Sequence, residues 1–249
     1  MIRIVIHAVA FFVIGLSGAL ARDASPAGSA EHVLEEGLHL AETLSSAKPI
    51  PCTPASGQWA GLKVENGRVI AADILNEIGG YARDAGVTGG LGGELRVVTS
   101  DQDYDSRLGE KPIVGSLRAA LGAGPAGPHW IVFALKPGAT ISLKDTLRLP
   151  DNVTLDGSCS DVVLEGPSKL GLVYIFGKRN VVIARLGFRQ SDYAQGKRNV
   201  SGQTCVRLNG LVDAVAILHN DLSRCGDGLI DITTSPSKPV PERSRITVG

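Results

Sequence analysis

The sequence predicts an all-β fold of the solenoid type, a parallel β-helix. One strand-like element recurs four times with spacings of about 28 to 33 residues, the range typical of repeat proteins. Most of the strand-like runs are short, bounded by Gly, Asn, Asp or Pro, and follow one another without an intervening helix. The four copies of the element are residues 152–155, 180–183, 213–217 and 244–248.

Two other all-β architectures compete with the solenoid. A β-sandwich has strands that alternate polar and apolar residues, whereas several runs here are continuously apolar, as in parallel sheets. A propeller would carry Trp-Asp or kelch-like signatures, and none is visible. The composition, with 31 glycines and 4% aromatic residues, suits many tight turns between short strands.

Residues 1–21 are predicted to be a secretory signal peptide. Arg3 supplies a positive charge, residues 4–16 are almost continuously apolar, and Ala19-Leu20-Ala21 fits a cleavage site. A membrane anchor is the alternative, but a span needs about 20 unbroken apolar residues. We therefore expect a secreted or periplasmic protein with no membrane contact in its mature form.

Residues 22–60 are predicted to form a linker and an N-terminal helix. Ala, Ser, Gly and Pro dominate residues 23–30, which is typical of a linker. Ser29 is a suitable N-cap for the following run, in which apolar residues recur near the helical period as far as Leu44.

Residues 61–249 are predicted to form the β-helix domain. Short helical runs are expected around residues 71–82 and over residues 116–121, and the glycines of residues 89–93 are interpreted as turn residues. Strands are expected at 130–135, 140–143, 146–149, 152–155, 162–165, 172–176, 181–188, 205–208, 214–218, 228–233 and 245–248.

The charged residues balance, with 25 basic and 25 acidic side chains, and cleavage after Ala21 would leave a net charge near −1. Global charge therefore predicts no nucleic-acid partner, and we expect a monomer. Four cysteines in an exported chain permit two disulfides with three possible connectivities. Cys205 with Cys225 is a plausible pair, because both lie on neighbouring repeats; the other two cysteines are Cys52 and Cys159.

Asp227 and Asp231 are the candidate metal ligands. Carboxylate oxygens suit Ca²⁺, and residues four apart on a strand face the same side. Full extension would separate the two by about 13 Å, so the chain must bend between them to share one ion, and Gly228 permits a bend. The alternative is a turn aspartate followed by a solvated strand aspartate.

A second candidate site is the run of basic residues between Lys178 and Arg198, in which Asp192 is the one acidic residue. Such a patch could attract a polyanionic chain although the protein is neutral overall. The alternative is a set of solvated loop and strand faces. The substrate-binding candidates are Lys178, Arg179, Lys197 and Arg198, and the run also contains Arg185 and Arg189.

From about residue 81 to residue 249 the chain resembles the pectate lyases of the first polysaccharide lyase family. Six landmarks occur in that family's order, although each is weak alone. They are Ala-Gly-Val-Thr-Gly-Gly at 85–90, Gly-Ser-Leu-Arg-Ala-Ala-Leu at 115–121, Val-Thr-Leu-Asp-Gly at 153–157, Asn-Val-Val-Ile at 180–183, Asp-Gly-Leu-Ile-Asp at 227–231 and Ser-Arg-Ile-Thr at 244–247.

The resemblance implies a right-handed parallel β-helix with a short N-terminal helical cap. It also implies calcium-dependent cleavage of polygalacturonate by β-elimination. In that reaction Ca²⁺ bridges enzyme and substrate carboxylates, and an arginine removes the proton on C5 while the glycosidic oxygen leaves C4. Asp227 and Asp231 match the family's calcium ligands.

The chain departs from the family pattern at two places. The aspartate usually supplied by the preceding repeat is replaced by Thr204 or Cys205. The family's Trp-Ile-Asp-His run is present as Ala-Ile-Leu-His at 216–219, so only His219 survives. His219 could serve as a general base, but we expect a structural role.

The sequence ends at Gly249, before the strands from which the family takes its substrate-binding lysine and catalytic arginines. We therefore expect a β-helix truncated at its C-terminus, with no catalytic residue in this chain and little activity by itself. A pectin hydrolase is disfavoured, because its Gly-His-Gly and Arg-Ile-Lys runs have no counterpart here. A non-catalytic polysaccharide-binding β-helix remains the main alternative.

Overall fold

A computed structural model describes residues 58–59, 61–122, 124, 126–167, 171–191, 204–233 and 246–249. All of them belong to the unit Ile50–Gly249. The predicted signal peptide, the linker and the first predicted helix lie outside the described residues, apart from Gln58 and Trp59.

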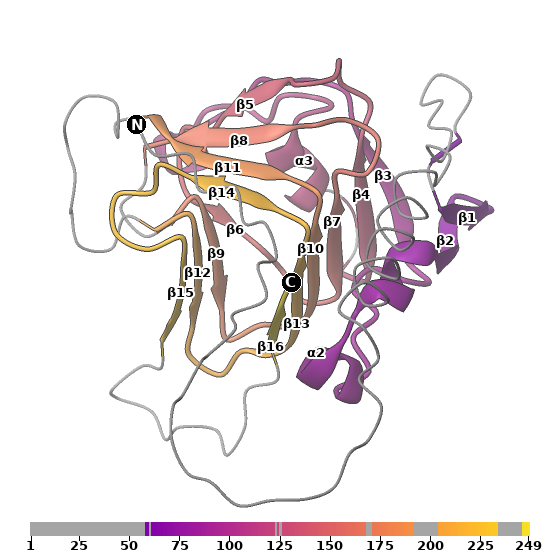
Figure 1. The fold of residues 1–249 in the computed structure, drawn as a ribbon. Coiled ribbons are helices and arrows are strands. Elements are labelled where there is room, and N and C mark those ends of the chain that lie inside the picture. The colour runs from indigo at the N-terminus through magenta and orange to yellow at the C-terminus, as the bar shows by residue number, and fades with distance from the viewer. Residues whose placement is uncertain are drawn as a thin grey trace, which may run out of the picture. The chain divides into compact units, whose positions relative to one another are not determined.

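The described strands form three sheets that surround a common interior, a right-handed parallel β-helix (Figure 1). One sheet contains, in spatial order, β1 (Leu62–Glu65), β2 (Arg68–Ala72), β3 (Glu94–Val98), β4 (His129–Phe133), β7 (Val153–Asp156), β10 (Arg179–Ala184), β13 (Asp213–Leu218) and β16 (Ile246–Val248). A second contains β14 (Asp221–Ser223), β11 (Gly187–Gln190), β8 (Val163–Gly166) and β5 (Thr140–Ser142). The third contains β15 (Ile230–Thr233), β12 (Val206–Asn209), β9 (Val173–Phe176) and β6 (Leu147–Arg148).

Consecutive coils stack in register. The chain visits the three sheets in turn, so that β7, β8 and β9 make one coil and β10, β11 and β12 make the next. The four predicted repeats lie on β7, β10, β13 and β16, where Val153, Val181, Val215 and Ile246 occupy equivalent positions. The solenoid prediction is therefore confirmed. Within the described sheets, the antiparallel pairings are β1 with β2 and β2 with β3.

Two predicted elements have different bounds in the structure. The run 181–188 is divided between β10 and β11 by Arg185, whose φ of 57° turns the chain from one sheet to the next. Arg185 holds this corner by donating to Ser158 Oγ and by pairing with Glu77. The helical run predicted around 71–82 is present but begins and ends later, as a 3₁₀ helix, Asp73–Glu77, followed by α2 (Gly80–Asp84).

Apolar residues fill the coil interior. The large buried side chains include Phe133, Leu155, Leu164 and Phe188, one from each of four neighbouring strands, and none is more than 1% exposed. The predicted helix over 116–121 is α3 (Leu117–Gly122), and Leu117 joins this same core.

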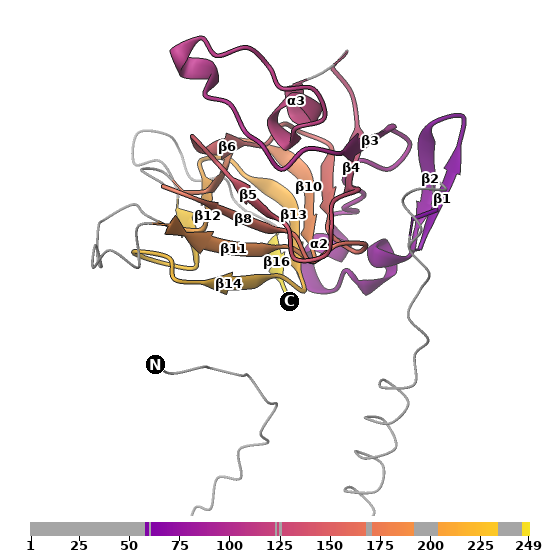
Figure 2. The same cartoon turned by 90° about the horizontal axis from the view of Figure 1, so that it is seen from above.

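The central strands of the eight-stranded sheet, β4, β7, β10 and β13, are largely buried on both faces, which explains why they are rich in apolar residues. Residues before β3 cover its outer face: Ile78, Ala82 and Val87 pack in one cluster with Val182 and Ala216 (Figure 2). The cover is tied to the last described strand, because Thr247 Oγ1 accepts from Ala82 N and donates to Gly79 O.

The glycines of 89–93 permit close approach to the sheet. A Cβ on Gly89 would lie 2.1 Å from Thr154 Oγ1, and a Cβ on Gly90 would lie 2.0 Å from the carbonyl oxygen of His129. Gly89 also has a φ of +55°. Contact with the sheet therefore requires both glycines, which the turn interpretation did not foresee, and backbone conformation adds a second requirement at Gly89 alone.

Asn180 joins this covering segment to two strands of the sheet. Its Oδ1 accepts from Thr88 N and Gly89 N, each at 2.8 Å, and its Nδ2 donates to Asn152 Oδ1 at 2.8 Å. Asn152, which precedes β7, and Asn180, the second residue of β10, both lie in the left-handed region, with φ of 55° and 57°, which asparagine tolerates well.

Replacing Asn180 with alanine is expected to lower the free energy of unfolding by about 1–3 kcal/mol, because partly buried donors and acceptors lose their partner. Chemical denaturation monitored by circular dichroism would measure the change. Asn76→Ala is the control, since the Asn76 side chain is exposed, and its effect is expected within about 0.5 kcal/mol. Equal effects of the two substitutions would contradict this account of Asn180.

The predicted disulfide Cys205–Cys225 is present, with the Cα atoms 5.5 Å apart. It links the start of β12 to the turn that precedes β15. Cys159 is also disulfide-bonded. Among the described residues, no helix has the length and apolar character needed to span a membrane.

Candidate functional site

The outer face of the sheet β6-β9-β12-β15 carries a row of functional side chains. Along each strand one set of residues points into the core, and the alternate set points outward. The outward positions that lie opposite one another form the outer row, which is Arg148, Tyr174, Arg207 and Asp231.

The members of the outer row contact one another. The Arg148 guanidinium carbon lies 5.2 Å from the centre of the Tyr174 ring, within cation–π range. The Tyr174 and Phe176 rings stack with centroids 5.8 Å apart, and Phe176 is 49% exposed. Arg207 Nε lies 3.3 Å from Asp231 Oδ2. The face therefore presents aromatic surface between two arginines.

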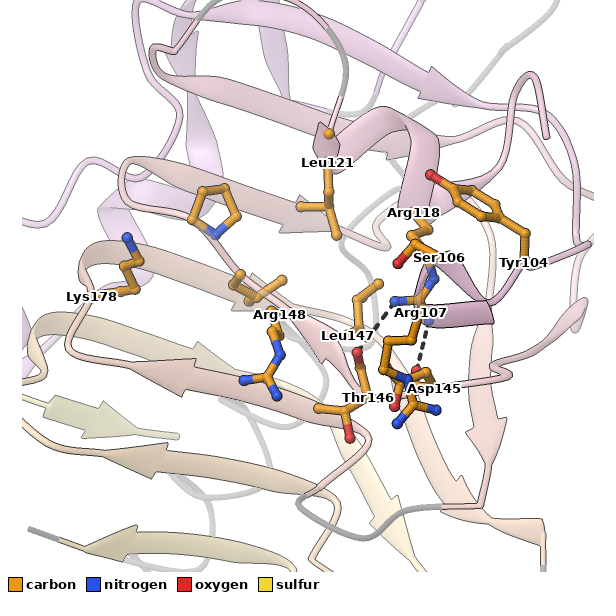
Figure 3. Close-up of a pocket in the computed structure, with 13 residues that line it drawn as sticks. Tyr104, Ser106, Arg107, Arg118, Leu121, Asp145, Thr146, Leu147, Arg148 and Lys178 are labelled. Atoms are coloured by element: carbon orange, nitrogen blue, oxygen red, sulfur yellow. Dashed lines mark hydrogen bonds and ion pairs between the residues drawn. The ribbon is translucent and has the colours of Figure 1, made fainter. Parts of the chain in front are cut away.

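A pocket of about 450 Å³ adjoins the first residue of the outer row, and it is rich in cationic side chains (Figure 3). Arg107, Arg118, Arg148 and Lys178 line it, against the single carboxylate of Asp145. In the view of Figure 3, Arg148 lies between Lys178 and Arg107.

Three of these four cations have carboxylate partners. Arg118 is paired with buried Asp103, Arg107 with Asp105 and Asp145, and Lys178 with Asp151. Arg148 has no carboxylate partner among the described residues. It is therefore the pocket cation with a charge available for an external anion.

The ion pairs near the pocket also affect titration. A side-chain hydrogen bond from Arg107 lowers the pKa of Asp105, and the same pair raises the pKa of Arg107. Lys144 lowers the pKa of Glu110 by its side-chain hydrogen bond. These acids stay ionised at neutral pH, so they continue to occupy their cationic partners.

The predicted metal ligands lie at the other end of the row. Asp227 is exposed in the turn before β15, and Asp231 is on β15. The turn is held by the Cys205–Cys225 disulfide and by Gly226 N, which donates to the buried Gln190 side chain.

Asp227 and Asp231 by themselves offer fewer oxygen ligands than calcium takes. Ca²⁺ takes six to eight oxygen ligands, and its tight sites collect several carboxylates. No group of three or more Asp, Glu, His or Cys side chains that could hold a metal occurs among the described residues. Asp231 is moreover engaged by the positive charge of Arg207. Calcium binding by Asp227 and Asp231 stays a prediction.

The basic run does not form one patch in the part that is described. Lys178 lines the pocket, Arg179 begins β10 in the neighbouring sheet, and its backbone N–H donates to Asp151. Arg185 and Arg189 follow farther round the coil and are paired with Glu77 and Glu165. Neighbours in the sequence thus lie on different sides of the solenoid. Lys197 and Arg198 lie outside the described residues.

His219 contacts Glu77, one of the residues before β3 that cover the eight-stranded sheet. Its Nε2 lies 2.7 Å from Glu77 Oε2, its backbone N–H donates to the carbonyl of Gly249, and its φ is 54°. Glu77 also pairs with Arg185. These contacts support the predicted structural role.

Arg148, Tyr174 and Arg207 were missed by sequence reasoning. A signal was present, because each residue follows the first apolar residue of a strand in the same sheet, as Asp231 does. Aligning the coils three strands at a time would have placed all four in one column.

No protein-family model matches the chain. A pectate lyase of Lilium longiflorum is 29% identical over 170 residues, 64% of this chain and 36% of that protein. A probable pectate lyase 12 of Arabidopsis thaliana is 31% identical, with 76% of this chain and 39% of that protein covered. Pectate lyase 1 of Ambrosia artemisiifolia is 28% identical, with 79% and 46% covered.

A solved structure, Jun a 1, the major allergen from cedar pollen, is 25% identical. The match covers 68% of this chain and 46% of that one, with a TM-score of 0.49.

The fold and the outer row define a parallel β-helix with a cationic and aromatic face on one sheet. The chain resembles pectate lyases in sequence. It spans less than half the length of these relatives, between 36% and 46%.

Proposed function

We propose that the chain is part of a pectate-lyase-like enzyme that binds polygalacturonate, an acidic polysaccharide, along the outer row. The observation that carries the proposal is the row itself: two arginines flank Tyr174, and an aromatic ring beside it is exposed. Arginine matches the planar carboxylate of a uronate, and aromatic rings offer an apolar surface to sugar rings. The resemblance to pectate lyases supports this assignment.

The proposed reaction is β-elimination. A base removes the proton on C5 of a uronate, the C4–O glycosidic bond breaks, and a C4–C5 double bond forms while the leaving oxygen takes up a proton. Negative charge develops on the substrate carboxylate as the C5 proton leaves. Arg148 and Arg207 would stabilise that charge electrostatically. No described residue is assigned the role of the base.

Export of the protein rests on residues 1–21 and remains a prediction. The Cys205–Cys225 disulfide supports it, because disulfides persist in oxidising compartments.

The purified chain should be incubated with polygalacturonate and the products analysed by ultraviolet absorbance and mass spectrometry. The chain by itself is expected to bind the polymer and to release little product, because none of its described residues is assigned the role of the base. Any product is expected to be an unsaturated uronide, because elimination leaves a double bond. Saturated products would indicate hydrolysis and contradict the proposed reaction, and absence of binding would contradict the whole assignment.

Replacing Arg148 with glutamine is expected to weaken oligogalacturonate binding about tenfold, because this pocket cation has no carboxylate partner among the described residues and so can pair with substrate. Isothermal titration calorimetry would measure the dissociation constant. Lys63→Gln is the control, since Lys63 is an exposed cation on β1 that already pairs with Glu65. Unchanged affinity in the Arg148 variant would show that the pocket end of the row does not contact the polymer.

A further inference from the structure

Arg207 occupies the centre of the outer row, between Tyr174 and Asp231 on the neighbouring strands. Its side chain is only 22% exposed and that of Asp231 is 26% exposed. The 3.3 Å contact brings the two charges together, yet the buried Nε has no hydrogen-bond partner among the described residues. One donor of the guanidinium is therefore unsatisfied at a partly desolvated position.

The contact between Arg207 and Asp231 disfavours a second cation beside Asp231. A divalent ion bound to Asp231 would lie about 2.3–2.6 Å from a carboxylate oxygen that already faces a guanidinium. Two positive groups that close repel strongly in a partly buried site. An ion that displaced Arg207 from Asp231 would also leave the arginine without its carboxylate partner.

Polar atoms near Arg207 are also left without partners. Thr204 Oγ1, Asn209 Oδ1 and Thr233 Oγ1 are buried and have no hydrogen-bond partner among the described residues. Asn209 is two residues after Arg207 on β12, and Thr233 lies opposite Asn209 on β15. Buried polar atoms without partners are uncommon, and a bound ion, water or ligand group is one explanation of them.

We propose that Arg207 takes the place of a divalent cation and binds the uronate carboxylate directly, so that oligogalacturonate binding does not depend on calcium. Asp231 then acts as a positioning residue that holds the guanidinium toward the face. Arg148 lies two strands away, about 10 Å along the stack, and supplies the second cation of the row. This inference rests on the proposed polygalacturonate binding and concerns how that binding is achieved.

Calorimetric titration of oligogalacturonate into the full chain tests the inference, once with CaCl₂ and once with a calcium chelator. The wild-type dissociation constant is expected to agree within about twofold between the two conditions. Arg207→Gln should weaken binding at least about tenfold in both. Arg207→Lys keeps the charge and loses the planar guanidinium, so its dissociation constant should lie between those of the wild type and Arg207→Gln.

Arg68→Gln is the matched control, because Arg68 is an exposed arginine on β2 in another sheet, and its affinity should equal that of the wild type. Circular dichroism of every variant would establish that it folds, and titration of CaCl₂ alone into the wild type should give no binding heat. Binding that the chelator abolishes, or an Arg207→Gln variant with wild-type affinity, would overturn the role of Arg207 and leave the proposed function standing. Absence of oligogalacturonate binding in both conditions would overturn both.

Discussion

Replacing Asp103 with alanine is expected to lower the free energy of unfolding by about 3–5 kcal/mol, because the substitution leaves a buried charge unpaired. The Asp103 side chain is 1% exposed and that of Arg118 is 11% exposed. Arg118 Nε donates to Asp103 Oδ1 at 2.8 Å and Nη2 to Oδ2 at 2.7 Å, a two-pronged contact. The backbone N–H of Lys144 donates to the same carboxylate at 2.9 Å.

Urea denaturation of the variant and the wild type would measure this change. Glu65→Ala is the matched control, since the Lys63–Glu65 pair has side chains 67% and 56% exposed, and its effect is expected within about 1 kcal/mol. Similar losses for the two variants would show that the buried pair contributes no more than a surface pair. Because Arg118 lines the pocket, a large loss of stability would also indicate that the ion pair stabilises this part of the pocket.

Removing the Cys205–Cys225 disulfide by a double alanine substitution is expected to lower the free energy of unfolding by about 3 kcal/mol. The bond joins residues 20 apart in the sequence, and a cross-link of that span restricts the unfolded chain by roughly that amount. Hydrogen exchange should also accelerate around residues 226–233, because the bond holds the turn that precedes β15.

Measurement under reducing conditions gives the control for this second variant. Reduction breaks every disulfide in both proteins, so their stabilities should become equal if the Cys205–Cys225 bond causes the difference. A difference that survives reduction would mean that the alanine side chains, and not the lost bond, destabilise the variant.

The sequence by itself predicted the solenoid, α3 and the disulfide pair. Four predicted repeats lie on successive strands of one sheet, β7, β10, β13 and β16. They were recognisable because a strand buried on both faces requires an apolar run, and because the turn between sheets requires a residue that tolerates its backbone conformation. The strand β14 was not predicted, since its residues Asp221–Ser223 carry no apolar run.

The outer row was recognised only in the tertiary structure, although Asp231 was already a candidate and an alignment of the coils would have indicated the other three residues. Arg148, Tyr174, Arg207 and Asp231 lie far apart in the chain, and they meet because each coil returns to the same sheet in a register set by backbone hydrogen bonds and interior packing. Residues close in the sequence separate for the same reason, as Lys178 and Arg189 do, because one coil carries them to different sides. Local pattern therefore determines which residues form strands, whereas the stacking of coils determines which side chains share a surface.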